Sequence, residues 1–206
     1  MEKLKKLLTK QKRGEFTTYM FMFTLVFMFM IFSMSLLKKN VALITVKKAE
    51  DSLKATTLAG ATADLEKYGS SGELVFIDYE DSYNNFKDSF KNSMELGDDF
   101  APTDVNSPIS TPIHIDAYIL YNVIDGNIEC ITYTNNGSTP NITHGTVGTI
   151  YTPNGIKVTH STVYSAISFD IQGYINNASM LGKVIHMDDI PVKKTCCIDI
   201  TGDETN

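Results

Sequence analysis

The chain has 206 residues and carries 18 lysines and arginines against 24 acidic residues, so its net charge is −6. This length accommodates one membrane anchor and one modest domain. Residues 1–69 carry a net charge of +6 and residues 70–206 carry −12, and an acidic distal region argues against nucleic-acid binding because phosphates would be repelled.

The first predicted element after a basic leader (residues 1–15) is a transmembrane helix over residues 16–37. The segment FTTYMFMFTLVFMFMIFSMSLL contains no charge, proline or glycine. As a helix it spans about 33 Å, which matches the hydrocarbon core of a bilayer. It is too long for an export signal, and no small-residue cleavage site follows it. A domain of this size could not bury a helix that is apolar on every side.

The charges beside this segment predict its orientation. Six basic residues precede it and four follow it: Lys3, Lys5, Lys6, Lys10, Lys12 and Arg13, then Lys38, Lys39, Lys47 and Lys48. The excess before the segment favours a cytoplasmic N-terminus and a C-terminal domain outside the cytoplasm.

Residues 38–69 are predicted to extend the helix in amphipathic form. The chain contains no proline between residues 16 and 68, and Gly60 is the one glycine there. Apolar residues recur at helical spacing with one slip, at Val46, Ala49, Leu53, Leu58, Ala61, Leu65 and Tyr68. Gly69, followed by SSG, is the expected end of the helix.

A second helix is predicted over residues 79–96. Five large residues share one face, at Tyr79, Tyr83, Phe86, Phe90 and Met94. Asp78 is the expected N-cap, and Gly97 is the expected residue after the C-cap. The face is interpreted as core packing, and residues 97–112 as a loop.

From Ile113 onward the pattern predicts strands. Alternating apolar residues over 113–124 are followed by a hairpin signal at Asp125–Asn127 and by IECITYT, with the loop NNGSTPN after it. A second hairpin is expected around TPNG (152–155), between TVGTIY and a long arm that bends or breaks near Ser165. KVIHMDDI (183–190) and TCCIDI (195–200) are expected as late strands.

These elements predict an α+β fold. The long N-terminal helix packs against a small antiparallel sheet of about five or six strands, and residues 70–206 form an extracytoplasmic domain.

The residues that could carry chemistry are few. Cys130 could form a disulfide with Cys196 or Cys197 outside the cytoplasm, and buried thiols in strands are an equally good interpretation. The four histidines are dispersed, and no catalytic, phosphate-binding or metal-binding motif occurs. We therefore expect no enzymatic activity, no cofactor and no metal.

The stretch KRGEF, the apolar segment and the helical extension resemble the N-terminal region of the type IV pilin superfamily, including the TadE-like minor pseudopilins. They are also similar to a family of uncharacterised single-pass membrane proteins from mobile elements of Gram-positive bacteria. The pilin resemblance implies cleavage after Gly14, which would leave Glu15 at the new N-terminus. It also implies partners: the lipid bilayer, other pilin-like subunits and assembly proteins.

One position departs from the pilin pattern. Pilins usually carry a glutamate five residues after the cut, whereas Glu15 directly follows Gly14 and residues 16–37 contain no carboxylate. The predicted function is a structural pilin-like or pseudopilin subunit of a surface filament or a secretion or conjugation apparatus. The alternative is a single-pass membrane protein whose exposed domain binds a partner.

Overall fold

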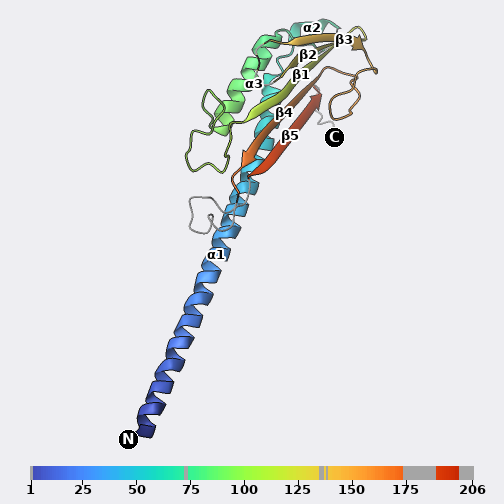
Figure 1. The fold of residues 1–206 in the computed structure, drawn as a ribbon. Coiled ribbons are helices and arrows are strands. Elements are labelled where there is room, and N and C mark those ends of the chain that lie inside the picture. The colour runs from blue at the N-terminus through green and yellow to red at the C-terminus, as the bar shows by residue number, and fades with distance from the viewer. Residues whose placement is uncertain (1, 72–73, 135–136, 138, 174–188, 200–206) are drawn as a thin grey trace. The chain divides into compact units, whose positions relative to one another are not determined.

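The computed structural model describes residues 2–71, 74–134, 137, 139–173 and 189–199, with the side chains from Phe16 onward except that of Ser71 (Figure 1). The chain forms two compact units, Met1–Ala42 and Leu43–Asn206. Three helices and five strands occur in the described ranges: α1 (Glu2–Gly60), α2 (Leu65–Ser71), α3 (Tyr79–Met94), β1 (His114–Ile124), β2 (Asn127–Tyr133), β3 (Asn141–Thr146), β4 (Thr162–Ile171) and β5 (Ile190–Asp199). A long N-terminal helix packs against an antiparallel sheet, which confirms the α+β class.

The part of α1 that belongs to the second unit packs with a face of small and hydroxyl residues. Ala49 and Leu53 are fully buried, as the apolar spacing predicts. Beyond them the prediction is wrong, because Leu58, Leu65 and Tyr68 are 51%, 74% and 50% exposed. From Leu43 onward the buried positions of α1 are instead Ala49, Ser52, Leu53, Thr56, Thr57 and Gly60.

Hydroxyl groups can take these buried positions because the helix itself supplies their acceptors. Thr56 donates its hydroxyl to the carbonyl of Ser52 at 2.7 Å, and Thr57 donates to the carbonyl of Leu53 at 2.6 Å. A buried polar group is costly only when it lacks a partner. The threonines therefore continue the regular helical spacing, and the apparent slip to Leu58 disappears.

The helix α1 ends at Gly60, not at Gly69 as predicted. An added Cβ at Gly60 would lie 2.9 Å from the Phe86 Cβ, the Ser82 carbonyl oxygen and the Tyr118 hydroxyl, so only glycine permits this approach. A separate helix, α2, follows, and the Asp64 carboxylate accepts the Lys67 N–H at 2.9 Å at its start. The predicted extension is therefore divided into two helices. The division lies at Gly60, where residues of α3 and β1 pack closely against the backbone of α1.

The third helix, α3, begins as predicted and ends two residues early. Asp78 is the N-cap, and its Oδ1 accepts the N–H groups of Glu80 and Asp81, both at 3.0 Å. The left-handed residue that ends the helix is Glu95, with φ 58°, and not Gly97. Local hydrogen bonds make this possible, since Leu96 N–H donates to the Lys91 carbonyl at 2.9 Å.

The aromatic face of α3 lies on the sheet, which confirms the core interpretation. Phe86 and Tyr118 have ring centroids 4.6 Å apart, and Tyr83 and Tyr133 have centroids 4.2 Å apart. Three buried hydroxyls in this layer have no partner among the described residues: Ser82, Tyr83 and Tyr118. Burial raises the pKa of Tyr83 to about 12 and raises that of Tyr118 further.

In the part of the chain that the structure describes, the sheet has five antiparallel strands in the order β3-β2-β1-β4-β5, which agrees with the predicted number. The predicted hairpin between β1 and β2 is confirmed, with Ile124 opposite Asn127. Asp125 and Gly126 both have positive φ, 48° and 75°, as a two-residue type I′ turn requires.

Three strand predictions need correction. The strand that pairs with β2 is β3, which contains Asn141 of the predicted loop and ends at Thr146, the first residue of TVGTIY. The rest of TVGTIY forms a bridge between Tyr151 and Lys157 rather than a strand. The strand β4 runs unbroken through Ser165, and the irregularity lies in β1 between Ile115 and Ala117. Of the late strands, TCCIDI is confirmed as far as Asp199, and positions 183–188 lie outside the described residues.

The two faces of the sheet have different covers. On the helix face α1 and α3 pack over β1, β2 and β4 (Figure 1). On the other face lies the segment 147–160, here called the strap, whose Val158 is buried in one hydrophobic cluster with Tyr121, Cys130 and Tyr164. Strand β1 is therefore buried from both sides, which explains why Tyr118 and Leu120 are buried as well as Ile119 and Tyr121.

Candidate functional site

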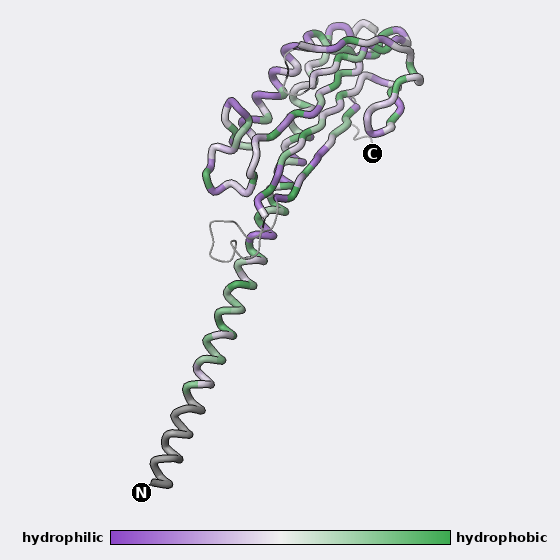
Figure 2. Tube along the Cα trace, in the orientation of Figure 1, coloured by the Kyte–Doolittle hydropathy of each residue, from purple (hydrophilic) through white to green (hydrophobic). Residues whose placement is uncertain are grey.

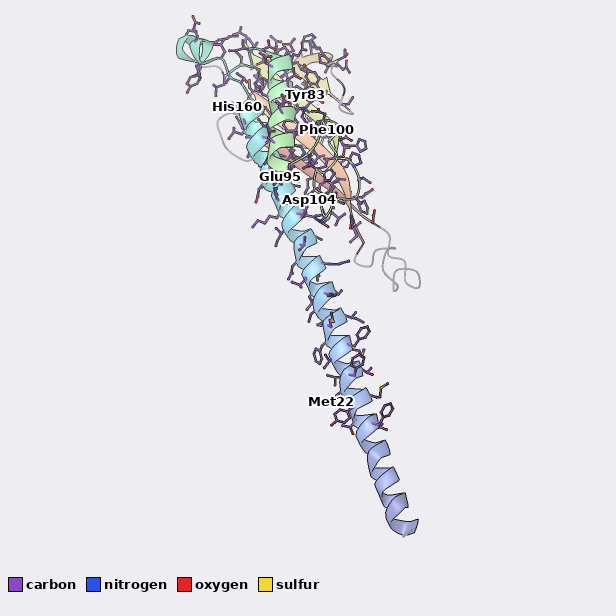
Figure 3. All side chains as sticks on the ribbon, turned by 90° about the vertical axis from the view of Figure 1, so that its left-hand side faces the viewer. Met22, Tyr83, Glu95, Phe100, Asp104 and His160 are labelled. Carbon is purple, nitrogen blue, oxygen red and sulfur yellow. The ribbon has the colours of Figure 1, made fainter. Side chains whose placement is uncertain are left out.

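The first candidate site is the apolar segment of α1. Every side chain from residue 16 to residue 41 is exposed, and Figure 2 shows this stretch as mostly hydrophobic. Within the described part of the chain, α1 is the one helix long and apolar enough to cross a membrane. Figure 3 shows the side chains around Met22 projecting from the helix on all sides. A solvent with the polarity of water would not favour such a surface.

The hydroxyl of Thr24 in this segment is compatible with a bilayer. Thr24 donates its hydroxyl to the carbonyl of Met20 at 2.8 Å, so its polar hydrogen is satisfied within the helix. Phe23 and Phe27 stack with ring centroids 6.5 Å apart. The proposed processing residues Gly14 and Glu15 lie within α1, and the position of the Glu15 carboxylate falls outside the described side chains.

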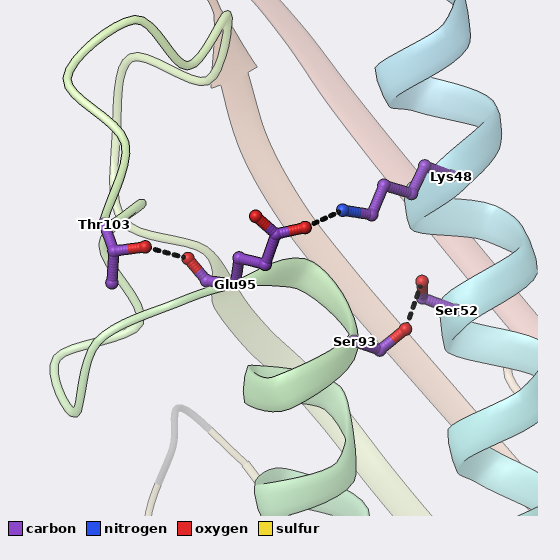
Figure 4. Close-up of polar contacts among 5 residues, drawn as sticks. All are labelled: Lys48, Ser52, Ser93, Glu95 and Thr103. Atoms are coloured by element: carbon purple, nitrogen blue, oxygen red, sulfur yellow. Dashed lines mark hydrogen bonds and ion pairs between the residues drawn. The ribbon is translucent and has the colours of Figure 1, made fainter.

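The second candidate site is the set of polar contacts that holds α1 within the second unit (Figure 4). Lys48 forms an ion pair with Glu95 at 2.8 Å, and Ser52 shares a hydrogen bond of 2.8 Å with Ser93. The Glu95 carbonyl accepts the Thr103 hydroxyl at 2.8 Å. Glu95, the residue that ends α3, therefore joins three segments of the chain.

Two further contacts join α1 to the sheet. Lys194 of β5 donates to Glu50 at 2.7 Å, with Lys54 also 3.6 Å from that carboxylate. The hydrogen bond from Lys194 and its charge lower the pKa of Glu50 below the ordinary value of 4.5. Thr57 and Ser165 place their hydroxyl oxygens 2.6 Å apart in a buried position.

A third polar group lies between α3, β1 and β2. Tyr79 donates its hydroxyl to Glu129 at 2.5 Å and accepts from the Asn122 amide at 3.1 Å. The Asn122 oxygen in turn accepts the N–H of Phe76 at 3.1 Å. Burial is the main reason that the pKa of Tyr79 is raised, and the Glu129 contact adds to it. The side-chain nitrogen and oxygen of Asn122 and the hydroxyl of Tyr79 all have hydrogen-bond partners. We therefore interpret this group as structural.

The cysteines lie on two strands, Cys130 on β2 and Cys196 and Cys197 on β5, with Cys130 and Cys197 on the same face of the sheet. Cys130, Cys196 and Cys197 are all buried, and no disulfide joins them within the described residues. Cys130 lies on β2 and Cys197 on β5, three strand spacings apart, or about 14 Å. A disulfide requires a Cα separation below about 7 Å. The sheet therefore has the buried-thiol arrangement, and the proposed Cys130 pairing is not formed.

The remaining chemistry-bearing residues do not converge. His114, His144 and His160 are exposed on separate segments, and His186 lies outside the described residues. Among the side chains that the structure describes, no group of three or more His, Cys, Asp or Glu could hold a metal ion. A shallow cavity of about 300 Å³ lies between β4, β5 and Thr111, and it collects no such group.

Sequence reasoning missed the contacts that join α1 to the second unit. Lys194 and Glu50 are separated by 144 positions, and Thr57 and Ser165 by 108. No local pattern indicates such pairings. Only the regular spacing of the small and hydroxyl residues along α1 could have shown that this face is buried.

Fold and site together define an α+β domain preceded in the same chain by one candidate membrane-spanning helix near the N-terminus, which is consistent with membrane anchoring. Comparison of the chain with protein-family models, curated proteins and solved structures finds no match.

Proposed function

We propose that this chain is a pilin-like or pseudopilin structural subunit of a surface filament or of a secretion or conjugation apparatus. The observation that carries the proposal is that a single helix, α1, supplies two kinds of surface. Residues 16–41 are exposed and mostly apolar, and Ala49 and Leu53 of the same helix are core residues of the second unit. A simple tether would need only the first of these surfaces.

In this proposal the N-terminus is cytoplasmic and the C-terminal domain lies outside. The support is the excess of basic residues before the apolar segment and the charge of −12 over residues 70–206. Cleavage after Gly14 would belong to the same assignment. Sequencing the N-terminus of the protein from its native membrane tests the cleavage alone, and an intact Met1 would remove it from the proposal.

The assembly itself is tested by electron microscopy of cell surfaces with an antibody against residues 70–206. We expect labelled filaments or labelled secretion complexes. Replacing residues 16–37 by an unrelated apolar segment of equal length is the matched control for tethering. For a structural subunit the labelled assemblies disappear while membrane insertion persists. If the assemblies survive this replacement, residues 16–37 are only a tether and partner binding by the exposed domain becomes the better assignment.

A further inference from the structure

The two edge strands of the sheet differ in whether they carry residues that oppose pairing with a strand of another chain. Edge strand β5 carries Pro191, Lys193 and Lys194, and proline and lysine at an edge oppose pairing with another chain. Edge strand β3 carries neither, and its residues from Asn141 to Thr146 are exposed except for the half-buried Gly145. Natural proteins rarely leave an edge strand without residues that prevent such pairing.

Edge strand β3 lies in a charge-free part of an acidic region. Residues 130–156 contain no aspartate, glutamate, lysine or arginine, although residues 70–206 carry a net charge of −12. Like charges on two copies would repel each other over most of this region. At β3 two copies can approach without placing carboxylates opposite each other.

The hairpin between β1 and β2 determines which groups of β3 point outward. Asn127 lies opposite Ile124 across the two-residue turn, so its N–H and C=O face β1. Gly126 faces the other way, and its carbonyl accepts the Val147 N–H at 3.0 Å. Bonding alternates along an antiparallel ladder, so Asn141, Thr143 and Gly145 bond to β2.

The N–H and C=O groups of Ile142 and His144 therefore point away from the sheet. Those of Thr146 point the same way, but Thr149 covers them, with its hydroxyl 3.3 Å from the Thr146 N–H and its own N–H donating to the Thr146 carbonyl at 3.1 Å. The outward groups of Ile142 and His144 lie symmetrically about Thr143.

We propose that β3 pairs antiparallel with β3 of a second copy of this chain, centred on Thr143. Ile142 of each copy then lies opposite His144 of the other, and the four outward groups of each copy form four hydrogen bonds in all. Thr143 faces Thr143 as the pair without backbone bonds, the position where side chains approach most closely. The strand is thus complementary to itself in one register.

A contact of this size is smaller than a stable interface between free proteins. It therefore forms when copies are concentrated, as they are when anchored in one bilayer. The inference depends on the sheet and not on the proposed filament. Absence of filaments in the microscope would leave it unaffected.

The test uses the full chain in lipid vesicles, with donor or acceptor dyes at the N-terminus and energy transfer as the measurement. We expect transfer above the random level for the unchanged chain. Thr143→Lys alone and Thr143→Glu alone should each lower it to the random level. An equal mixture of the two variants should restore it, because opposite charges then face each other across the pair.

Val105 provides the matched control, since its side chain is 95% exposed in the loop before β1. Val105→Lys and Val105→Glu make the same charge changes away from the edge and should leave energy transfer unchanged. The proposal is overturned if the unchanged chain shows only random transfer, or if the Thr143 variants transfer as it does. It is also overturned if both variants lose transfer but the mixture does not recover it, which would indicate a strand from a different protein.

Discussion

The hydroxyl oxygens of Thr57 in α1 and Ser165 in β4 lie 2.6 Å apart, and both residues are fully buried. Thr57 donates its only hydroxyl hydrogen to the Leu53 carbonyl at 2.6 Å. Ser165 must therefore be the donor to Thr57. This contact joins the first helix of the chain to the centre of the sheet through two polar groups that both have partners.

Replacing Thr57 with valine should destabilise the second unit by about 1–3 kcal/mol, because the buried Ser165 hydroxyl then lacks an acceptor. Thr56 is the matched control. It is also buried, and its hydroxyl bonds only to carbonyls of α1 itself. Thr56→Val should cost less than about half as much. Thermal unfolding in detergent, followed by the near-ultraviolet circular dichroism of the buried tyrosines, measures both. Equal losses would mean that the contact with Ser165 contributes nothing.

Gly60→Ala should destabilise the fold by about 1–3 kcal/mol, because the new Cβ would lie 2.9 Å from two side chains and a backbone oxygen. Gly69→Ala in α2 is the control, since nothing lies within 4 Å of its added Cβ. Alanine is the better helix former, so this change should be neutral or stabilise by up to about 1 kcal/mol. The free energies of unfolding of both variants, measured with a chemical denaturant, test this prediction. A tolerated Gly60→Ala would show that α1 does not need this close approach.

Tyr118→Phe should leave stability unchanged or raise it by about 1 kcal/mol, because it removes a buried hydroxyl that has no partner among the described residues. Tyr79→Phe makes the same chemical change where the hydroxyl contacts both Glu129 and Asn122. We expect that variant to lose about 1–3 kcal/mol. The two melting temperatures, measured side by side, should move in opposite directions or differ clearly. A loss for Tyr118→Phe would indicate a bound water at its hydroxyl.

The ion pair between Glu50 and Lys194 should make stability depend on pH in a defined direction. The pKa of Glu50 is lower in the folded chain than its ordinary value of 4.5, chiefly through the Lys194 hydrogen bond. Its contribution is therefore fully present above pH 4.5 and is lost as the pH falls through the lower folded value. Both side chains are partly exposed, so the contribution is about 0.2–1 kcal/mol.

Glu50→Gln tests this directly. At pH 7 the variant should melt below the unchanged chain, and the gap should close as the pH is lowered below 4.5. Melting temperatures across this range measure it. A gap that stays constant with pH would mean that Glu50 acts through packing rather than charge.

A charge in the middle of the apolar segment should weaken membrane insertion. Val26→Arg would place a guanidinium near the centre of residues 16–37, at a cost of about 2.5–3.5 kcal/mol on insertion scales. Val26→Leu is the control and should insert as the unchanged chain does. Extraction of isolated membranes with alkaline carbonate separates inserted from loosely bound protein. If all three forms stay in the soluble fraction, the segment is not a membrane anchor.

Local signals in the sequence predicted the features that depend on neighbouring residues. Asp78 is the N-cap, the aromatic face of α3 is buried, and the Asp125–Gly126 turn forms the first hairpin. Each of these follows from helical spacing, capping or turn chemistry within a few residues. The apolar character of residues 16–37 was equally predictable, because it follows from the composition of the segment alone.

The features that the sequence did not reveal depend on distant parts of the chain. The end of α1 at Gly60 is imposed by Phe86 and Tyr118, which lie far along the sequence. The strand β3 contains one large apolar residue, Ile142, and exists because it pairs with β2. The separation of Cys130 from Cys197 follows from the strand order, which no spacing of cysteines can show.

Because α1 covers one face of the sheet, it determines where a soluble fragment of this protein can begin. A fragment that starts at residue 70 would lack Ala49, Leu53 and Thr57, and would expose the strands beneath them to solvent. Such a fragment would tend to aggregate. A soluble fragment suitable for crystallisation must instead begin near Leu43, where the second compact unit starts.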